Sequence, residues 1–142
     1  MKKSQHGFSI VSAIFLLVVL AFLGVAMTTL STTQNQGAAM DVMGSRAYQA
    51  ARAGIEWAAY NVSISPASSA TPWAGCVAAK TVAVAADLAP FSPVTVSCVA
   101  NSYIEGASTI WIYDVSAVAQ TTGLVAGNQD FVQRVITVKL GK

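Results

Sequence analysis

The sequence predicts an α+β protein in which a long N-terminal helix, membrane-spanning in its first half, packs on a small antiparallel β-sheet. Three observations support this fold class. Phe8 to Met27 is an uncharged apolar run of about 20 residues, the length that crosses a bilayer core of ~30 Å as a helix. An amphipathic helical pattern follows from Met40 to Val62, and the rest of the chain is rich in β-branched and aromatic residues.

The second half of this helix carries one stripe of small and apolar residues, repeated at spacings of three and four. The stripe consists of Met40, Met43, Ala47, Ala50, Ala51, Gly54, Ile55, Ala58 and Val62. Arg46, Arg52 and Glu56 lie off it. We therefore expect a helix over 8–62, with its transmembrane part at 8–27, and a β-rich head over 63–142 that covers the stripe.

Four segments of the head are predicted as strands: 77–85, 94–99, 109–118 and 131–140. The last two are rich in β-branched and aromatic residues, which favour strands. The polar, glycine-containing stretch between them, Thr121–Asp130, is long enough to join an antiparallel pair. The segment 82–88 is also compatible with a short helix.

The N-terminus has three interpretations. A cleavable secretory signal has an apolar core of only ~7–15 residues, and the run here is longer. An ordinary single-pass anchor is the second interpretation. The third is a short basic leader that is removed before the apolar helix, on the cytoplasmic side. Lys2 and Lys3 fit the positive-inside rule, and Gly7 directly precedes Phe8 where this third interpretation requires a cleavage site.

The leader and the start of the helix resemble the prepilins of type IV pili and the pseudopilins of type II secretion systems. The matching residues are Gly7, Phe8, Ser9, Ile10 and Val11. The resemblance implies that residues 1–7 are a leader, that a prepilin peptidase cuts between Gly7 and Phe8, and that Phe8 becomes N-methylated. It also implies partners: other pilins, major and minor, through the N-terminal helix, the prepilin peptidase and the inner-membrane assembly platform.

Ser12 departs from the major pilins of this family, which carry Glu at the fifth mature position. A carboxylate inside the bilayer is costly and needs a partner, thought to be a neighbouring subunit's N-terminal ammonium. Ser12 is neutral and cannot form that ion pair, and some minor pilins and pseudopilins also lack the Glu. We therefore expect a minor subunit. A serine in a membrane helix can also bond back to a helix carbonyl, and both interpretations stay open.

The block from Arg46 to Trp57 resembles the corresponding helix of PilX-type and MshP-type minor pilins, although Arg52 stands where that pattern often has Glu. The resemblance implies a minor pilin that helps initiate or cap a type IV pilus of the mannose-sensitive haemagglutinin (MSHA) type. Such a protein begins in the inner membrane, with its head in the periplasm, and then enters the pilus, where the tip is one position. The alternatives are a type II secretion pseudopilin, which usually has a larger head, and a membrane-anchored periplasmic binding protein or enzyme.

Cys76 and Cys98 are the only cysteines. A periplasmic head lies in an oxidising compartment, where an isolated pair usually forms a disulfide. Loop-closure entropy for the roughly 20 residues they enclose gives ~3 kcal/mol. Two free core cysteines are the alternative. A zinc site is poorly supported, because two cysteines do not complete a ligand set and the only histidine, His6, lies in the leader.

The sequence offers no catalytic constellation. No nucleophile motif or phosphate-binding glycine loop is present, and the six acidic residues are scattered. We expect no enzymatic activity and no cofactor. Without Lys2 and Lys3, six basic residues balance six acidic ones, so nothing indicates nucleic-acid binding.

Overall fold

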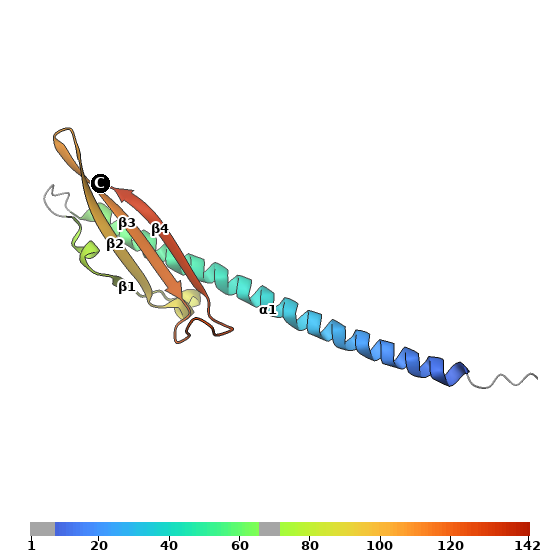
Figure 1. Cartoon of the computed structure of the whole chain (residues 1–142). Coiled ribbons are helices and arrows are strands. Elements are labelled where there is room, and N and C mark those ends of the chain that lie inside the picture. Colours follow the sequence, from blue (N-terminus) through green and yellow to red (C-terminus); the bar gives the residue numbers. More distant parts are fainter. Residues whose placement is uncertain (1–7, 66–71) are drawn as a thin grey trace, which may run out of the picture. The chain divides into compact units, whose positions relative to one another are not determined.

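The structure, a computed structural model, describes residues 8–65 and 72–142. The chain forms two compact units, residues 1–39 and 40–142. Helix α1 (Phe8–Ile64) contributes to both, and its later turns belong to the second unit, here called the head (Figure 1). The helix ends two residues beyond its expected end at 62.

The head contains one four-stranded sheet in which every neighbouring pair of strands is antiparallel. Its spatial order follows the chain: β1 (Lys80–Val82), β2 (Val94–Glu105), β3 (Ser108–Gln120) and β4 (Gln133–Gly141). Two short 3-10 helices, η1 (Ala74–Val77) and η2 (Ala86–Phe91), lie before β1 and β2. The predicted α+β class is confirmed, and so is the antiparallel pair formed across the loop 121–130.

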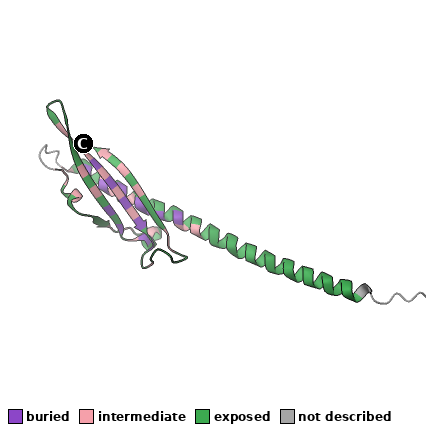
Figure 2. Cartoon of the chain, in the orientation of Figure 1, coloured by how far each residue is buried: buried purple, intermediate pink, exposed green. Residues whose placement is uncertain are grey.

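The core lies between α1 and one face of the sheet, and the predicted helical stripe forms its helical side (Figure 2). Seven of the nine stripe residues are buried, and Met40 and Met43 are half-buried. The strands present alternate residues to this stripe, as the pleat requires. The buried strand residues are Val94 and Val96 of β2 and Tyr113, Val115, Ala117 and Ala119 of β3.

Small residues let the sheet approach α1 closely. Four of the buried stripe residues are alanines, and at Gly54 the sheet lies so close that an added Cβ atom would meet it. A Cβ atom on Gly54 would lie 2.9 Å from Val94 Cγ1 and 3.2 Å from Ala117 Cβ. Val94 and Ala117 are completely buried, so neither can easily move aside. The residue at 54 therefore sets the distance between helix and sheet.

The strand predicted over 77–85 is wrong at both ends. Val77 lies in η1, where the Cys76 backbone N–H donates to the Trp73 carbonyl at 3.0 Å, and only Lys80–Val82 pairs with β2. The alternative of a short helix within 82–88 comes closer, because η2 begins at Ala86. Pro90 within η2 has no N–H for a strand ladder.

Strand β2 is longer than predicted. It continues six residues beyond Val99 to Glu105, paired throughout with β3. A two-residue connection joins the strands, and Gly106 takes a positive φ of 62° there, as such tight hairpin turns require.

The side chain of Lys142 closes the C-terminal end of α1. Its ammonium donates to the carbonyl oxygens of Val62 and Ser63, each at 2.9 Å, and to that of Ser65. These carbonyls lie at or beyond the last turn, where a helix has no internal donors left. The backbone of Lys142 pairs with Trp111 of β3 at 2.8 and 2.9 Å. One residue thus caps the helix and ties that cap to the sheet.

We predict that Gly54→Ala destabilises the head, although alanine is the better helix former by ~1 kcal/mol. The added methyl must displace Val94 or Ala117, and such overpacking costs ~1–3 kcal/mol. Urea unfolding followed by circular dichroism should show a net loss, larger still for Gly54→Leu. Gly37→Ala is the matched control, since its Cβ meets nothing within 4 Å. A Gly54→Ala protein as stable as the parent would show that the contact is not tight.

We predict that Lys142→Met, which keeps a long apolar stem but removes the ammonium, lowers the unfolding free energy of the head by ~1–2 kcal/mol. A partly buried cation at a helix C-terminus contributes up to ~2 kcal/mol. The exposed Lys80 supplies the control, because Lys80→Met should leave the urea midpoint nearly unchanged. Equal midpoints for the two variants would contradict a capping role.

Candidate functional site: the membrane segment and the head

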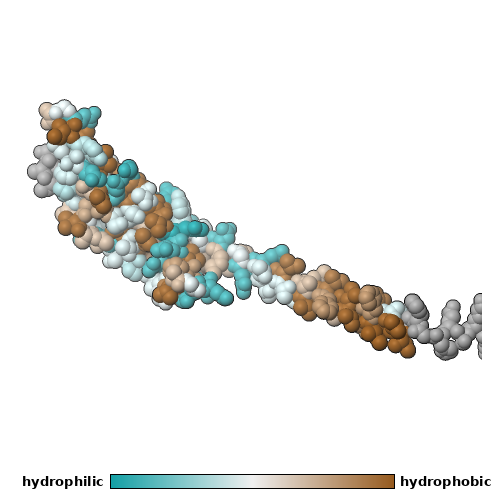
Figure 3. Space-filling view, in the orientation of Figure 1, coloured by the Kyte–Doolittle hydropathy of each residue, from teal (hydrophilic) through white to brown (hydrophobic). Residues whose placement is uncertain are grey.

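Within the described ranges, α1 alone is long and apolar enough to cross a membrane, judged by length and composition. Every residue from Ile10 to Ala39 is exposed. Large side chains such as Phe22, 74% exposed, lie within this stretch, and its first turns form the brown surface in Figure 3. A continuous exposed apolar surface of this size marks contact with a membrane or another protein.

Polar residues begin directly after this apolar stretch, and the helix accommodates them internally. The hydroxyls of Thr28, Thr29, Thr32 and Thr33 donate to carbonyl oxygens one turn earlier, at 2.8–3.2 Å. Such back-bonding satisfies a hydroxyl that has no other donor or acceptor nearby. The helix itself continues through the predicted exit from the apolar region.

The residues of the predicted cleavage and methylation site lie at the start of this segment. Gly7, with the rest of the leader, lies outside the described residues. Phe8 is the first residue of α1, and Ser12 lies one turn later on the exposed stretch. Cleavage after Gly7, methylation of Phe8 and the role of Ser12 stay predictions.

The two cysteines are joined, as expected. Cys76 of η1 and Cys98 of β2 form a disulfide, with their Cα atoms 4.6 Å apart and 22 residues between them in sequence. Both residues are half-buried and pack against the core. The bond therefore fixes η1 beside the sheet, just beyond the point where β1 stops pairing with β2.

The three tryptophans are all half-buried and contact the core rather than forming an exposed patch. The rings of Trp57 and Trp73 meet edge to face, with centroids 5.9 Å apart. The backbone N–H of Trp73 donates to the hydroxyl of buried Tyr113 at 3.2 Å. These aromatics hold the segment before η1 against α1 and β3, which is a packing role.

Cross-strand polar pairs line the outer face of the sheet. Asp114 of β3 lies opposite Lys139 of β4, and their charged atoms are 2.8 Å apart. The hydrogen bond to Asp114 and its negative charge raise the pKa of the Lys139 ammonium above its ordinary value. A raised pKa means that the pair stabilises the fold at neutral pH, and this contribution is lost as the pH rises through the folded value. Because the Lys139 side chain is 75% exposed, solvent keeps the effect small.

An open hollow of about 390 Å³ lies between the last turns of α1 and the end of β4. Its lining includes Lys139 and Lys142. Lys139 is ion-paired with Asp114, and Lys142 Nζ donates to three carbonyl oxygens, so both ammonium groups already have partners within the head. In the described part of the chain, no three His, Cys, Asp or Glu side chains come together as a metal site would require. The hollow therefore offers little chemistry to a charged ligand.

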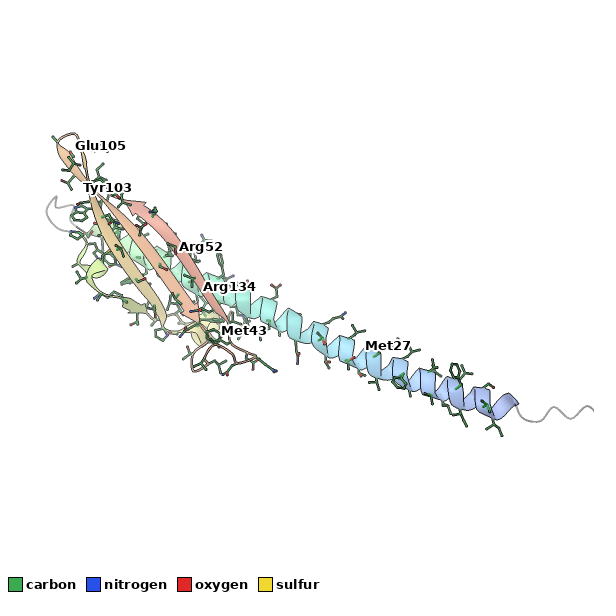
Figure 4. All side chains as sticks on the ribbon, viewed as in Figure 1. Met27, Met43, Arg52, Tyr103, Glu105 and Arg134 are labelled. Atoms are coloured by element: carbon green, nitrogen blue, oxygen red, sulfur yellow. A yellow bond between two sulfur atoms is a disulfide. The ribbon has the colours of Figure 1, made fainter. Side chains whose placement is uncertain are left out.

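Two contacts were not predicted from the sequence. The first is the Lys142 cap, and the second is the packing of Arg134 on α1, where Nη2 would lie 3.2 Å from a Cβ on buried Gly44 (Figure 4). Arg134 alternates with Gln133 and Val135 in the predicted strand 131–140, and Gly44 lies one residue after Met43 of the stripe. Their contact depends on the register between helix and sheet, which neither pattern contains.

Comparison with protein-family models, curated proteins and solved structures finds no match to this chain. The geometry and the sequence motifs therefore carry the functional argument.

We predict that loss of the disulfide, by Cys98→Ser or by reduction, lowers the unfolding free energy by ~2–4 kcal/mol, because the unfolded chain regains a long loop. Cys98→Ala replaces the cysteine by an apolar residue, which suits the packed site better than serine, and its loss of unfolding free energy should fall in the same range. Mass spectrometry after alkylation without reductant should find neither cysteine labelled in the parent. Full labelling of both in native protein would contradict the bond.

Proposed function

We propose that this chain is a pilin-like protein, anchored by the apolar part of α1 and carrying a periplasmic head. More particularly, we propose a minor pilin similar to the MshP type, which helps initiate or cap an MSHA-type pilus. The observation that carries the proposal is the order of features: a basic leader that ends at Gly7, then at once, from Phe8, an apolar helix that continues into the head.

The two halves of α1 support a structural role. The stripe of the second half packs in the core of the head, whereas the residues from Ile10 to Ala39 are all exposed. An exposed apolar helix suits lipid before assembly and the helices of other pilins afterwards, since both are apolar surroundings. The same surface serves the membrane-inserted subunit and the assembled one.

Ser12 supports a minor subunit rather than the repeating one. Glu at this position in major pilins is expected to pair with a neighbour's N-terminal ammonium, and a hydroxyl carries no charge for that pair. A subunit without it suits a place that is occupied once or a few times in a filament, including the tip.

The alternative that shares most features is a type II secretion pseudopilin. The described residues of the head form one four-stranded sheet, without the inserted domains usual in the pseudopilins that lack this Glu. A membrane-anchored binding protein is the third candidate. The hollow beside β4, whose two lysines are already paired, does not favour it.

We predict that the mature protein begins at an N-methylated Phe8. Intact-mass analysis of protein extracted from membranes of a strain with prepilin peptidase should show loss of residues 1–7 plus one methyl group. Gly7→Leu should abolish the cut, because a bulky side chain blocks backbone approach at the scissile bond. His6→Leu, one residue upstream, is the matched control and should be cleaved normally.

Other outcomes separate the alternatives. An uncut Met1, or a start near Thr28, would contradict a prepilin and leave an ordinary anchor or a secretory signal. Correct cleavage together with dominance of this chain in sheared filaments would contradict a minor subunit. Correct cleavage, with loss of secretion but normal piliation on deletion, would favour the pseudopilin.

A further inference from the structure

Residues 72–82 lie against the sheet with few buried contacts. None of them is buried, and five in succession, 77–81, are exposed. They include η1 and β1, and β1 pairs with β2 over three residues only, Val94–Val96. A segment with so few buried contacts opens locally at a lower free energy than the core beside it.

This segment covers the sheet where β1 ends. β2 continues to Glu105 beyond its pairing with β1, and η1 lies against β2 there. Trp73 precedes η1, and its ring meets the ring of Trp57 of α1. Its backbone N–H donates to the hydroxyl of Tyr113. A short helix or loop over a strand edge is one means by which sheets avoid pairing with other chains.

The disulfide is the strongest attachment of this segment. Within the described ranges, the bond from Trp73 to Tyr113 is the one hydrogen bond that joins residues 72–78 to other elements of the head. η1 has no side-chain cap and no buried residue. The bond between Cys76 and Cys98 therefore carries most of the link between η1 and β2.

The core of the head is built without this segment. Its buried residues lie in α1, at Phe91, and in β2 and β3. Lys142 joins the end of α1 to β3 by separate hydrogen bonds. Release of residues 72–82 would leave these contacts in place, and it would uncover the ring of Trp57 and the hydroxyl of Tyr113.

We propose that residues 72–82, here called the clasp, form a redox-sensitive device. The Cys76–Cys98 bond keeps the clasp closed over β2, and reduction lets it open while the core stays folded. Reduction takes two electrons and two protons from a dithiol, which is left as a disulfide, and yields the Cys76 and Cys98 thiols. This inference rests on the disulfide of the structure and does not depend on the pilin function.

The clasp makes an oxidised head different from an unoxidised one. In an oxidising compartment the bond persists, so the β2 edge and the aromatic residues stay covered. A head without the bond presents an uncovered strand edge and a chain segment that opens readily. Because proteolysis follows the population of the opened state, the unoxidised head is the one that proteases cut.

Limited digestion with trypsin tests the device, because Lys80 lies within the clasp. The full-length chain carrying both Cys76→Ala and Cys98→Ala, purified in detergent, should be cut after Lys80 roughly tenfold faster than the parent. Dithiothreitol added to the parent should have the same effect. Fragments are compared after complete reduction, since the disulfide joins the two pieces of a cut parent.

Other tryptic sites distinguish opening of the clasp from unfolding of the head. Arg52 of α1 and Arg134 of β4 lie in elements that the core holds, so cleavage after them should stay slow in the double variant. Hydrogen exchange followed by mass spectrometry should show lower protection over residues 72–82 and unchanged protection in β3.

Gly75→Ala separates the bond from the packing. A Cβ at this position would lie 2.1–2.5 Å from three atoms of the Trp73 ring, so the variant displaces the ring while the disulfide remains. We expect its cleavage after Lys80 to stay close to that of the parent.

Three results would overturn the proposal. The first is equal cleavage after Lys80 in the double variant and the parent. The second is cleavage of the double variant after Arg134 as fast as after Lys80, which would mean that the bond holds the whole head. The third is rapid cleavage after Lys80 in Gly75→Ala with its disulfide intact, which would assign closure to the packing of Trp73.

Discussion

The close contact between the alanine and glycine stripe of α1 and the inner face of the sheet is the constraint on which the head depends. The alanines on this side of the helix have side chains no longer than Cβ, and Gly54 has none. This side can therefore lie directly on a layer of valines and alanines. Because β2 and β3 supply that layer, they occupy the centre of the sheet. The remaining features hold this contact in place: the Cys76–Cys98 bond fixes η1 beside β2, and Lys142 joins the end of the helix to β3.

One helix meets two kinds of surroundings, and its sequence changes accordingly. From Ile10 to Met27 its large apolar side chains are exposed, polar residues follow, and from Met40 the buried small residues lie on one face. The first pattern is stable only where the surroundings are themselves apolar, while the second needs a partner layer on one side alone. The boundary between the two compact units falls where the second pattern begins, at Met40.

Sequence periodicity predicted the elements whose pattern is local. The stripe of α1 follows from spacings of three and four, and the antiparallel pair of β3 and β4 follows from β-branched and aromatic segments on either side of a polar loop. The structure confirms both. The limits of β1 and β2 were not predictable in this way. The start of β1 depends on the disulfide that fixes η1, and the end of β2 depends on the hairpin turn at Gly106. Neither constraint appears as a repeat in the sequence. The Lys142 cap was even less predictable, since no sequence pattern links a lysine at residue 142 to carbonyl groups at 62–65. The roles predicted for Gly7, Phe8 and Ser12 rest on a family resemblance. Cleavage cannot be recognised in the fold of the uncut chain.

The β2–β3 ribbon, which continues beyond β1 and β4, is a consequence of the same architecture. α1 supports the sheet only as far as its own last turn, and the β2–β3 ribbon continues past that support. A two-stranded ribbon is marginally stable alone, and an uncovered edge invites pairing with other chains. η1 covers part of the β2 edge, and the Cys76–Cys98 bond, more than the core, holds η1 in place. The head thus relies on a covalent bond at the point where its core contacts end.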